Sequence, residues 1–127
     1  MDLTAAQRYL QEREDVAFAY LFGSMATGKT TPLSDVDIAV YLTGGNLPEK
    51  RLELIGDLCD RLGTDRLDLV ILNTAPPGLR ARVVRSKRVL AERMPTERHA
   101  FESRTLREYM DFSKLENRIL EQRCRHG

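Results

Sequence analysis

The sequence predicts one α/β (α+β) domain in which helices pack against a small β-sheet. Residues 16–22 are apolar without interruption, residues 35–42 and 66–72 alternate with a period of two, and helical spacing recurs between and after these segments. The chain has 127 residues, of which 42% are hydrophobic and 31% are charged. It is therefore long enough to form a single domain, residues 1–127, around one hydrophobic core.

The first two predicted elements are a helix over residues 3–13 and a strand over residues 16–22. The helix places apolar side chains every three or four residues, with charged residues between them. The strand is rich in aromatic and β-branched residues, which is typical of a strand buried on both faces. It ends at Gly23-Ser24, and a turn-rich stretch over residues 25–33 follows.

Two alternating segments, residues 35–42 and 66–72, predict strands with one apolar face each. The opposite face carries Asp35 and Asp37 in the first strand and Asp68 in the second. We expect the apolar faces to pack against the core; they consist of Val36, Ile38, Val40 and Leu42 in the first strand and of Leu67, Leu69 and Ile71 in the second.

The remaining pattern predicts helices over residues 48–62, 79–86 and 96–123, with a short strand over residues 88–92 between the last two. Gly63 is well placed to end the first of these helices. The helical positions that we expect to be buried are Leu52, Ile55, Cys59 and Leu62 in the first helix and Phe101, Leu106, Tyr109, Leu115, Ile119 and Leu120 in the last.

The strongest chemical signal is the spacing of the carboxylates. Asp35 and Asp37 leave the same face of a strand, about 6–7 Å apart at the backbone, and repel each other unless a cation lies between them. Such oxygen ligands suit Mg²⁺. If the strand with Asp68 lies alongside, three carboxylates can hold two ions, or Asp68 can take the proton from an attacking hydroxyl. An isolated Asp-x-Asp is also common on a solvent-exposed strand face.

Gly23-Ser24, directly after a buried strand, is a candidate phosphate-binding turn. Glycine lets a phosphate approach the backbone, and free amide hydrogens with the Ser24 hydroxyl can bind its oxygens. Lys29, in the stretch that follows, can neutralise phosphate charge. The simpler interpretations are an ordinary turn and a solvent-exposed loop lysine.

Composition argues against several classes of protein. The formal net charge is +1, and no apolar run reaches the roughly 20 residues of a membrane helix. Residues 1–4 show no basic segment leading into an apolar stretch, so we expect no signal peptide. Cys59 and Cys124 match no metal-ligand spacing, and we expect reduced thiols in a cytoplasmic protein.

A basic run without an acid contains Arg80, Arg82, Arg85, Lys87 and Arg88. It is interpreted either as a solvated helix face or, together with the predicted helix over residues 96–123, as an interface for a partner protein. The run lacks the interleaved aromatic residues of a single-strand nucleic-acid platform, so we expect no direct nucleic-acid substrate.

The sequence resembles a known family. Leu21-Phe22-Gly23-Ser24, followed after ten residues by Asp35-Val36-Asp37-Ile38-Ala39-Val40, is similar to the signature of the DNA polymerase β-like nucleotidyltransferases. Nearly the whole chain resembles more closely the minimal nucleotidyltransferases called MNT proteins, the antitoxin partners of HEPN-domain toxins. Residues 65–70 match the family's third-carboxylate strand, and residues 72–80 and 88–92 resemble the segment after it in the antitoxin subgroup.

The resemblance implies a nucleotidyltransferase core with a small mixed β-sheet, with ATP and Mg²⁺ as cosubstrates. It also implies transfer of AMP to a tyrosine of a cognate HEPN ribonuclease toxin, which is thereby neutralised. Carried over by position, Gly23 and Ser24 bind the triphosphate, Asp35 and Asp37 bind metal ions, and Asp68 binds the metal or the acceptor hydroxyl.

One departure from the resemblance concerns the loop after the Gly-Ser turn. Relatives often have an arginine just before the glycine of this loop, whereas this chain has Thr27-Gly28-Lys29. Lys29 is therefore the candidate replacement as a phosphate contact.

Two other functions stay open at this stage. The protein can be an antitoxin that acts by binding alone, through the basic run and the last helix. It can also be an enzyme that modifies a small molecule such as an aminoglycoside, although such chains usually add a second domain around the acceptor. A nucleic-acid polymerase is disfavoured because the chain has no room for thumb or finger domains.

Overall fold

The computed structural model describes residues 3–23, 26, 28 and 35–126, with the backbone alone for residues 112–126. The predicted elements are all present, with bounds that differ by a few residues. In chain order they are α1 (Leu3–Glu12), β1 (Val16–Phe22), β2 (Val36–Leu42), α3 (Leu47–Leu62), β3 (Leu67–Ile71), α4 (Pro77–Ser86), β4 (Arg88–Glu92) and α5 (Pro95–His126).

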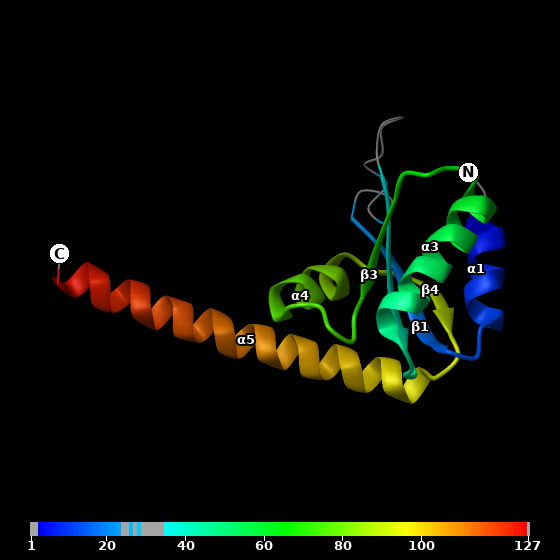
Figure 1. Cartoon of the computed structure of the whole chain (residues 1–127). Coiled ribbons are helices and arrows are strands. Elements are labelled where there is room, and N and C mark those ends of the chain that lie inside the picture. Colours follow the sequence, from blue (N-terminus) through cyan, green and yellow to red (C-terminus); the bar gives the residue numbers. More distant parts are fainter. Residues whose placement is uncertain (1–2, 24–25, 27, 29–34, 127) are drawn as a thin grey trace.

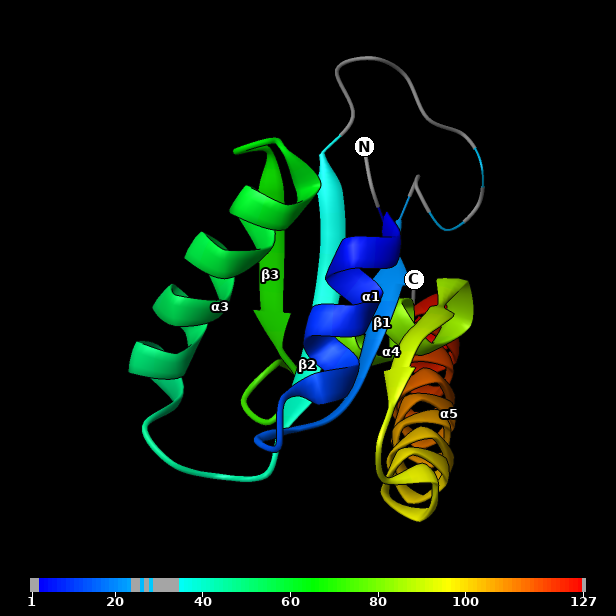
Figure 2. The same cartoon turned by 90° about the vertical axis from the view of Figure 1, so that its right-hand side faces the viewer.

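The four strands form one mixed sheet with the order β3-β2-β1-β4 (Figure 2). β1 is antiparallel to both β2 and β4, whereas β2 and β3 are parallel. A parallel pair needs a crossover connection, and α3 provides it between β2 and β3. This topology confirms the α/β (α+β) fold class and the mixed sheet, and it places the starts of β2 and β3 side by side.

Helices cover both faces of the sheet. α1 and α3 lie on one face, and α4 and α5 lie on the other (Figure 1). The first face packs the apolar residues predicted for β2 and β3. The second face is a separate core with a cluster of aromatic rings from β1, β2 and α5: Phe18, Tyr20, Tyr41 and Phe101.

The second core corrects the prediction that each alternating strand has a single apolar face against the core. Ala39, on the face of Asp37, is fully buried, and Tyr41 on that face is half-buried. Only the ends of the strands leave this face open. The candidate carboxylates therefore lie at the rim of a covered face.

Several predictions about buried helical positions are wrong. Leu52 is 69% exposed and Leu106 is 41% exposed, whereas Leu54 and Leu58 are fully buried. Cys59 is half-buried and lines an open hollow. The buried face of α3 is therefore rotated about the helix axis from the predicted one. The apolar residues of this helix fit more than one helical spacing, and the sequence pattern alone does not choose between them. The expectations for Leu115, Ile119 and Leu120 lie outside the described side chains.

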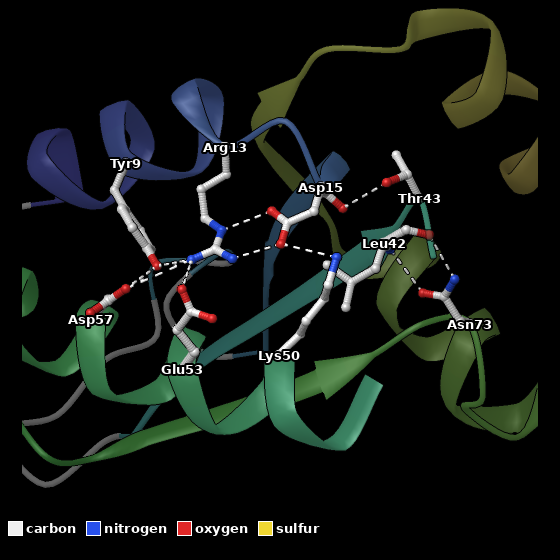
Figure 3. Close-up of polar contacts among 9 residues, drawn as sticks. All are labelled: Tyr9, Arg13, Asp15, Leu42, Thr43, Lys50, Glu53, Asp57 and Asn73. Atoms are coloured by element: carbon white, nitrogen blue, oxygen red, sulfur yellow. Dashed lines mark hydrogen bonds and ion pairs between the residues drawn. The ribbon is translucent and has the colours of Figure 1, made fainter. Parts of the chain in front are cut away.

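Polar side chains join α1 to α3 beside the sheet (Figure 3). Arg13 donates from Nε and Nη2 to the two carboxylate oxygens of Asp15, over 2.8 and 2.6 Å, and from Nη1 to Glu53 over 2.9 Å. Lys50 forms an ion pair with Asp15 at 3.3 Å. Tyr9 donates to Asp57. These contacts attach α1 and the start of β1 to α3.

The ends of α3 follow the sequence signals. Asn46 accepts a hydrogen bond from the amide of Glu49 as the N-cap, and Pro48 lies in the first turn. Gly63 ends the helix in the left-handed conformation, at φ 69°, as predicted. Among the described residues, no helix combines the length and the apolar content needed to cross a bilayer.

Candidate active site

Asp37 and Asp68 are directly paired in the register of the parallel strands β2 and β3. Neighbouring strands lie about 4.8 Å apart, and paired residues project their side chains from the same face. That face is the one covered by α4 and α5, because Ala39 and Val70, two residues further along, pack in the aromatic core. The topology therefore brings together two carboxylates that are 31 positions apart in sequence.

Asp35 lies just before β2 and is exposed. Asp68 is also exposed, whereas Asp37 is half-buried. The three acids thus differ in exposure: Asp37 is partly enclosed, and Asp35 and Asp68 face solvent.

The pKa of Asp37 is raised, first by burial and then by the charge of Asp68, with a smaller contribution from Asp35; the charge of Arg82 opposes the rise. Burial is the main cause of the raised pKa, and the negative charge of Asp68 and Asp35, which a bound cation would relieve, adds to it.

Gly23 approaches Asp37 closely. The last residue of β1, Phe22, pairs with Asp37 in the sheet, and Gly23 follows it at φ 71°. A Cβ on Gly23 would collide with Oδ2 of Asp37. Both the backbone conformation and the lack of space thus require glycine here.

The other predicted phosphate contacts, Ser24 and Lys29, lie outside the described residues. The amide of Ala26 donates to the carbonyl of Gly23 over 3.2 Å, so the chain turns immediately after β1. The turn expected at this position is confirmed for Gly23.

The donor set suits Mg²⁺, because it consists of carboxylate oxygens in a region of excess negative charge. Within the described residues, no group of three His, Cys, Asp or Glu side chains lies close enough to hold a metal ion. Mg²⁺ is commonly held by one or two carboxylates together with substrate phosphates and water. The pair Asp37 and Asp68, open to solvent on one side, fits that mode of binding.

The basic run at 80–88 does not form one uniform surface. Arg80 donates to the carbonyls of Leu72 and Asn73, each over 3.1 Å, and so fixes the start of α4. Arg85 stacks on the ring of Tyr109, with 4.9 Å from its Cζ to the ring centroid. Arg82 is exposed, and its positive charge opposes the rise in the pKa of Asp37. Sequence reasoning missed this role, although the run of cations was the signal.

Comparison with known sequences identifies a family. The model of the family described as polymerase beta, nucleotidyltransferase matches residues 5–96, which span all the candidate residues. No curated protein matches the chain.

Solved structures agree with this match. A chain of a toxin–antitoxin complex crystallised with AMP-PNP has a TM-score of 0.79 and 26% identity, covering 96% of this chain and 98% of that chain. A chain of a mutant MntA–HpeT toxin–antitoxin has a TM-score of 0.77 and 27% identity, with coverage of 96% and 97%. The complex of tri-AMPylated Shewanella oneidensis HEPN toxin with MNT antitoxin is similar in fold: its matching chain has a TM-score of 0.66 and 24% identity, with coverage of 91% and 97%.

Proposed function

Because the chain belongs to the polymerase β nucleotidyltransferase family, and is thus a nucleotidyltransferase, we propose that it transfers AMP from ATP to a tyrosine hydroxyl of a cognate HEPN ribonuclease toxin. The transfer neutralises the toxin, so the protein is its antitoxin. The observation that carries the proposal is the pairing of Asp37 with Asp68, with the carboxylate of Asp37 packed directly against Gly23 at the end of β1.

The similar complexes supply the choice of donor and acceptor. One contains AMP-PNP, an analogue of ATP, and another contains an AMPylated HEPN toxin. The matches cover more than nine-tenths of this chain.

Each candidate residue has a proposed role. Gly23 and Ser24 bind the triphosphate through backbone amides and a hydroxyl, and Lys29 neutralises phosphate charge. Asp35 and Asp37 hold Mg²⁺, and Asp68 holds Mg²⁺ or accepts the proton of the acceptor hydroxyl. When bound, Mg²⁺ neutralises charge on the phosphate oxygens and lowers the barrier to displacement.

The reaction is an in-line displacement at the α-phosphorus. The tyrosine oxygen forms a new P–O bond, and the bond between the α-phosphorus and the bridging oxygen of pyrophosphate breaks. The hydroxyl proton passes to a carboxylate, for which the exposed Asp68 is the accessible candidate, and then to water. Pyrophosphate leaves with the electron pair of the broken bond.

The test is to incubate the purified protein with ATP, Mg²⁺ and the cognate HEPN toxin and to measure the intact mass of both chains. We expect the toxin to gain whole AMP units. Asp37→Asn removes the charge of the central carboxylate and should lower the transfer rate by at least a hundredfold.

Asp60→Asn is the matched control, because Asp60 is exposed on α3 and does not face the pair. It should transfer AMP at the rate of the wild type. A stable complex without any mass gain would contradict the enzymatic proposal and indicate an antitoxin that acts by contact alone. Equal loss in the two variants would contradict the assignment of the site.

A further inference from the structure

The path of α4 brings a cation to the carboxylates. β3 runs from Leu67 beside Val36 to Ile71 beside Val40, so its last residue lies at the end of the sheet opposite Asp37. α4 begins there, where Arg80 holds the carbonyls of Leu72 and Asn73. It then returns along the sheet, since β4 begins at Arg88, which pairs with Leu21 near the end of β1.

α4 also lies on the face of the sheet from which Asp37 and Asp68 project. Val83 and Val84 of α4 pack in the aromatic core, together with Ala39 and Val70 of the carboxylate strands. Arg82 is the cation immediately before these two anchoring residues. Its position on α4 and the returning path of the helix place its charge near the open rim of the sheet.

Arg82 differs from its neighbours in how its guanidinium is used. Arg80 and Arg85 are committed to carbonyls and to Tyr109, and Lys87 pairs with Glu102 at 2.8 Å. Within the described part of the chain, the guanidinium of Arg82 is exposed and has no hydrogen-bond or ion-pair partner.

We propose that Arg82 is a nucleotide-binding residue that contacts the phosphates of the donor from α4. This inference rests on the proposed nucleotide-transfer function. A guanidinium offers several N–H donors in a planar fork that matches phosphate oxygens. Arg82 thus offers the phosphates a guanidinium from a regular helix.

The test is a calorimetric titration of AMP-PNP with Mg²⁺ into the wild type, Arg82→Ala, Arg82→Lys and Arg88→Ala. Arg88→Ala is the matched control: it removes the same charge from the same basic run, but Arg88 pairs with Leu21, whose side chain lies in the core of the opposite face. Thermal unfolding of each variant without nucleotide checks that the fold is kept.

We expect Arg82→Ala to weaken AMP-PNP binding about tenfold to a hundredfold, as for a lost charge-assisted hydrogen bond. Arg82→Lys should lose less, and Arg88→Ala should stay within about twofold. The inference is overturned if Arg82→Ala binds like the wild type, if both alanine variants weaken equally, or if the wild type binds no AMP-PNP.

The same proteins separate this inference from the proposed function. If binding depends on Arg82 but the toxin gains no AMP from the wild type, the inference stands and the proposed acceptor is wrong. If the toxin is modified and Arg82→Ala binds normally, only the inference fails.

Discussion

Among single residues, Gly23 carries the sharpest prediction. Gly23→Ala adds a Cβ that collides with Oδ2 of Asp37, and it also forces alanine to a φ of 71°. The carboxylate must move or the turn must open, so we expect AMP transfer to fall at least a hundredfold. The backbone cost in stability should be only about 1–2 kcal/mol.

A second glycine isolates the collision from the backbone strain. Gly63 has nearly the same φ, 69°, but a Cβ there meets nothing within 4 Å. Gly63→Ala should therefore lose similar stability in urea unfolding and keep its transfer activity. Equal loss of activity in both variants would contradict a special contact between Gly23 and Asp37.

The residues of the candidate site differ in how far sequence could predict them. The period-two alternation was enough to place Asp35 and Asp37 on one face, and Asp68 on the face of its own strand. The pairing of Asp37 with Asp68 needed the parallel register of β2 and β3, which a single sequence does not contain. Arg82 was hidden for the same reason, since its proximity to Asp37 depends on how α4 crosses the sheet.

Among the elements, α5 contacts the sheet through the carboxylate of Glu102 as well as through Phe101. Glu102 accepts a hydrogen bond from the hydroxyl of Tyr20 and pairs with Arg98 and Lys87, each over 2.8 Å. Its side chain is only 14% exposed. Glu102→Ala removes the carboxylate partner of Tyr20 and Lys87 and one of the two carboxylates that pair with Arg98, so we expect the free energy of unfolding to fall by about 2–4 kcal/mol.

Urea denaturation measures this loss, and Glu108→Ala is the control on the same helix. Glu108 is half-buried and has no hydrogen-bond or ion-pair partner among the described residues, so its removal should cost less than about 0.5 kcal/mol. A similar loss in both variants would mean that Glu102 acts through helix propensity and does not dock α5.

Strands were easier to predict than the buried sides of helices. Residues 16–22 coincide with β1, because a short apolar run rich in aromatic and β-branched residues is typical of a strand buried between two layers. In α3, Leu52 and Leu54 each belong to a possible apolar face of the helix. Packing against the sheet buries the face with Leu54 and leaves Leu52 exposed. In α5, Leu106 continues the helical spacing from Phe101, but the neighbouring Thr105 is the buried residue, and Leu106 is 41% exposed.

For the whole molecule, the polar network of Figure 3 makes stability depend on pH. Hydrogen bonds from Arg13, supported by Lys50, lower the pKa of Asp15 from 3.8 to about 2. A lowered pKa in the folded state means that the ionised carboxylate stabilises the fold above about pH 4. This contribution is lost as the pH falls through about 2. After allowance for partial exposure, it amounts to about 1–2 kcal/mol at pH 7.

We therefore expect Asp15→Asn to be less stable than the wild type by a constant amount from about pH 7 to pH 4. The difference should shrink between about pH 4 and pH 2, because the wild-type carboxylate then becomes protonated and loses the same interaction. Urea unfolding at a series of pH values measures it. The control is Glu14→Gln, at an exposed neighbouring acid, whose difference from the wild type should stay near zero throughout. A difference for Asp15→Asn that persisted unchanged at pH 2 would mean that shape and hydrogen bonding, rather than the carboxylate charge, join α1 to α3.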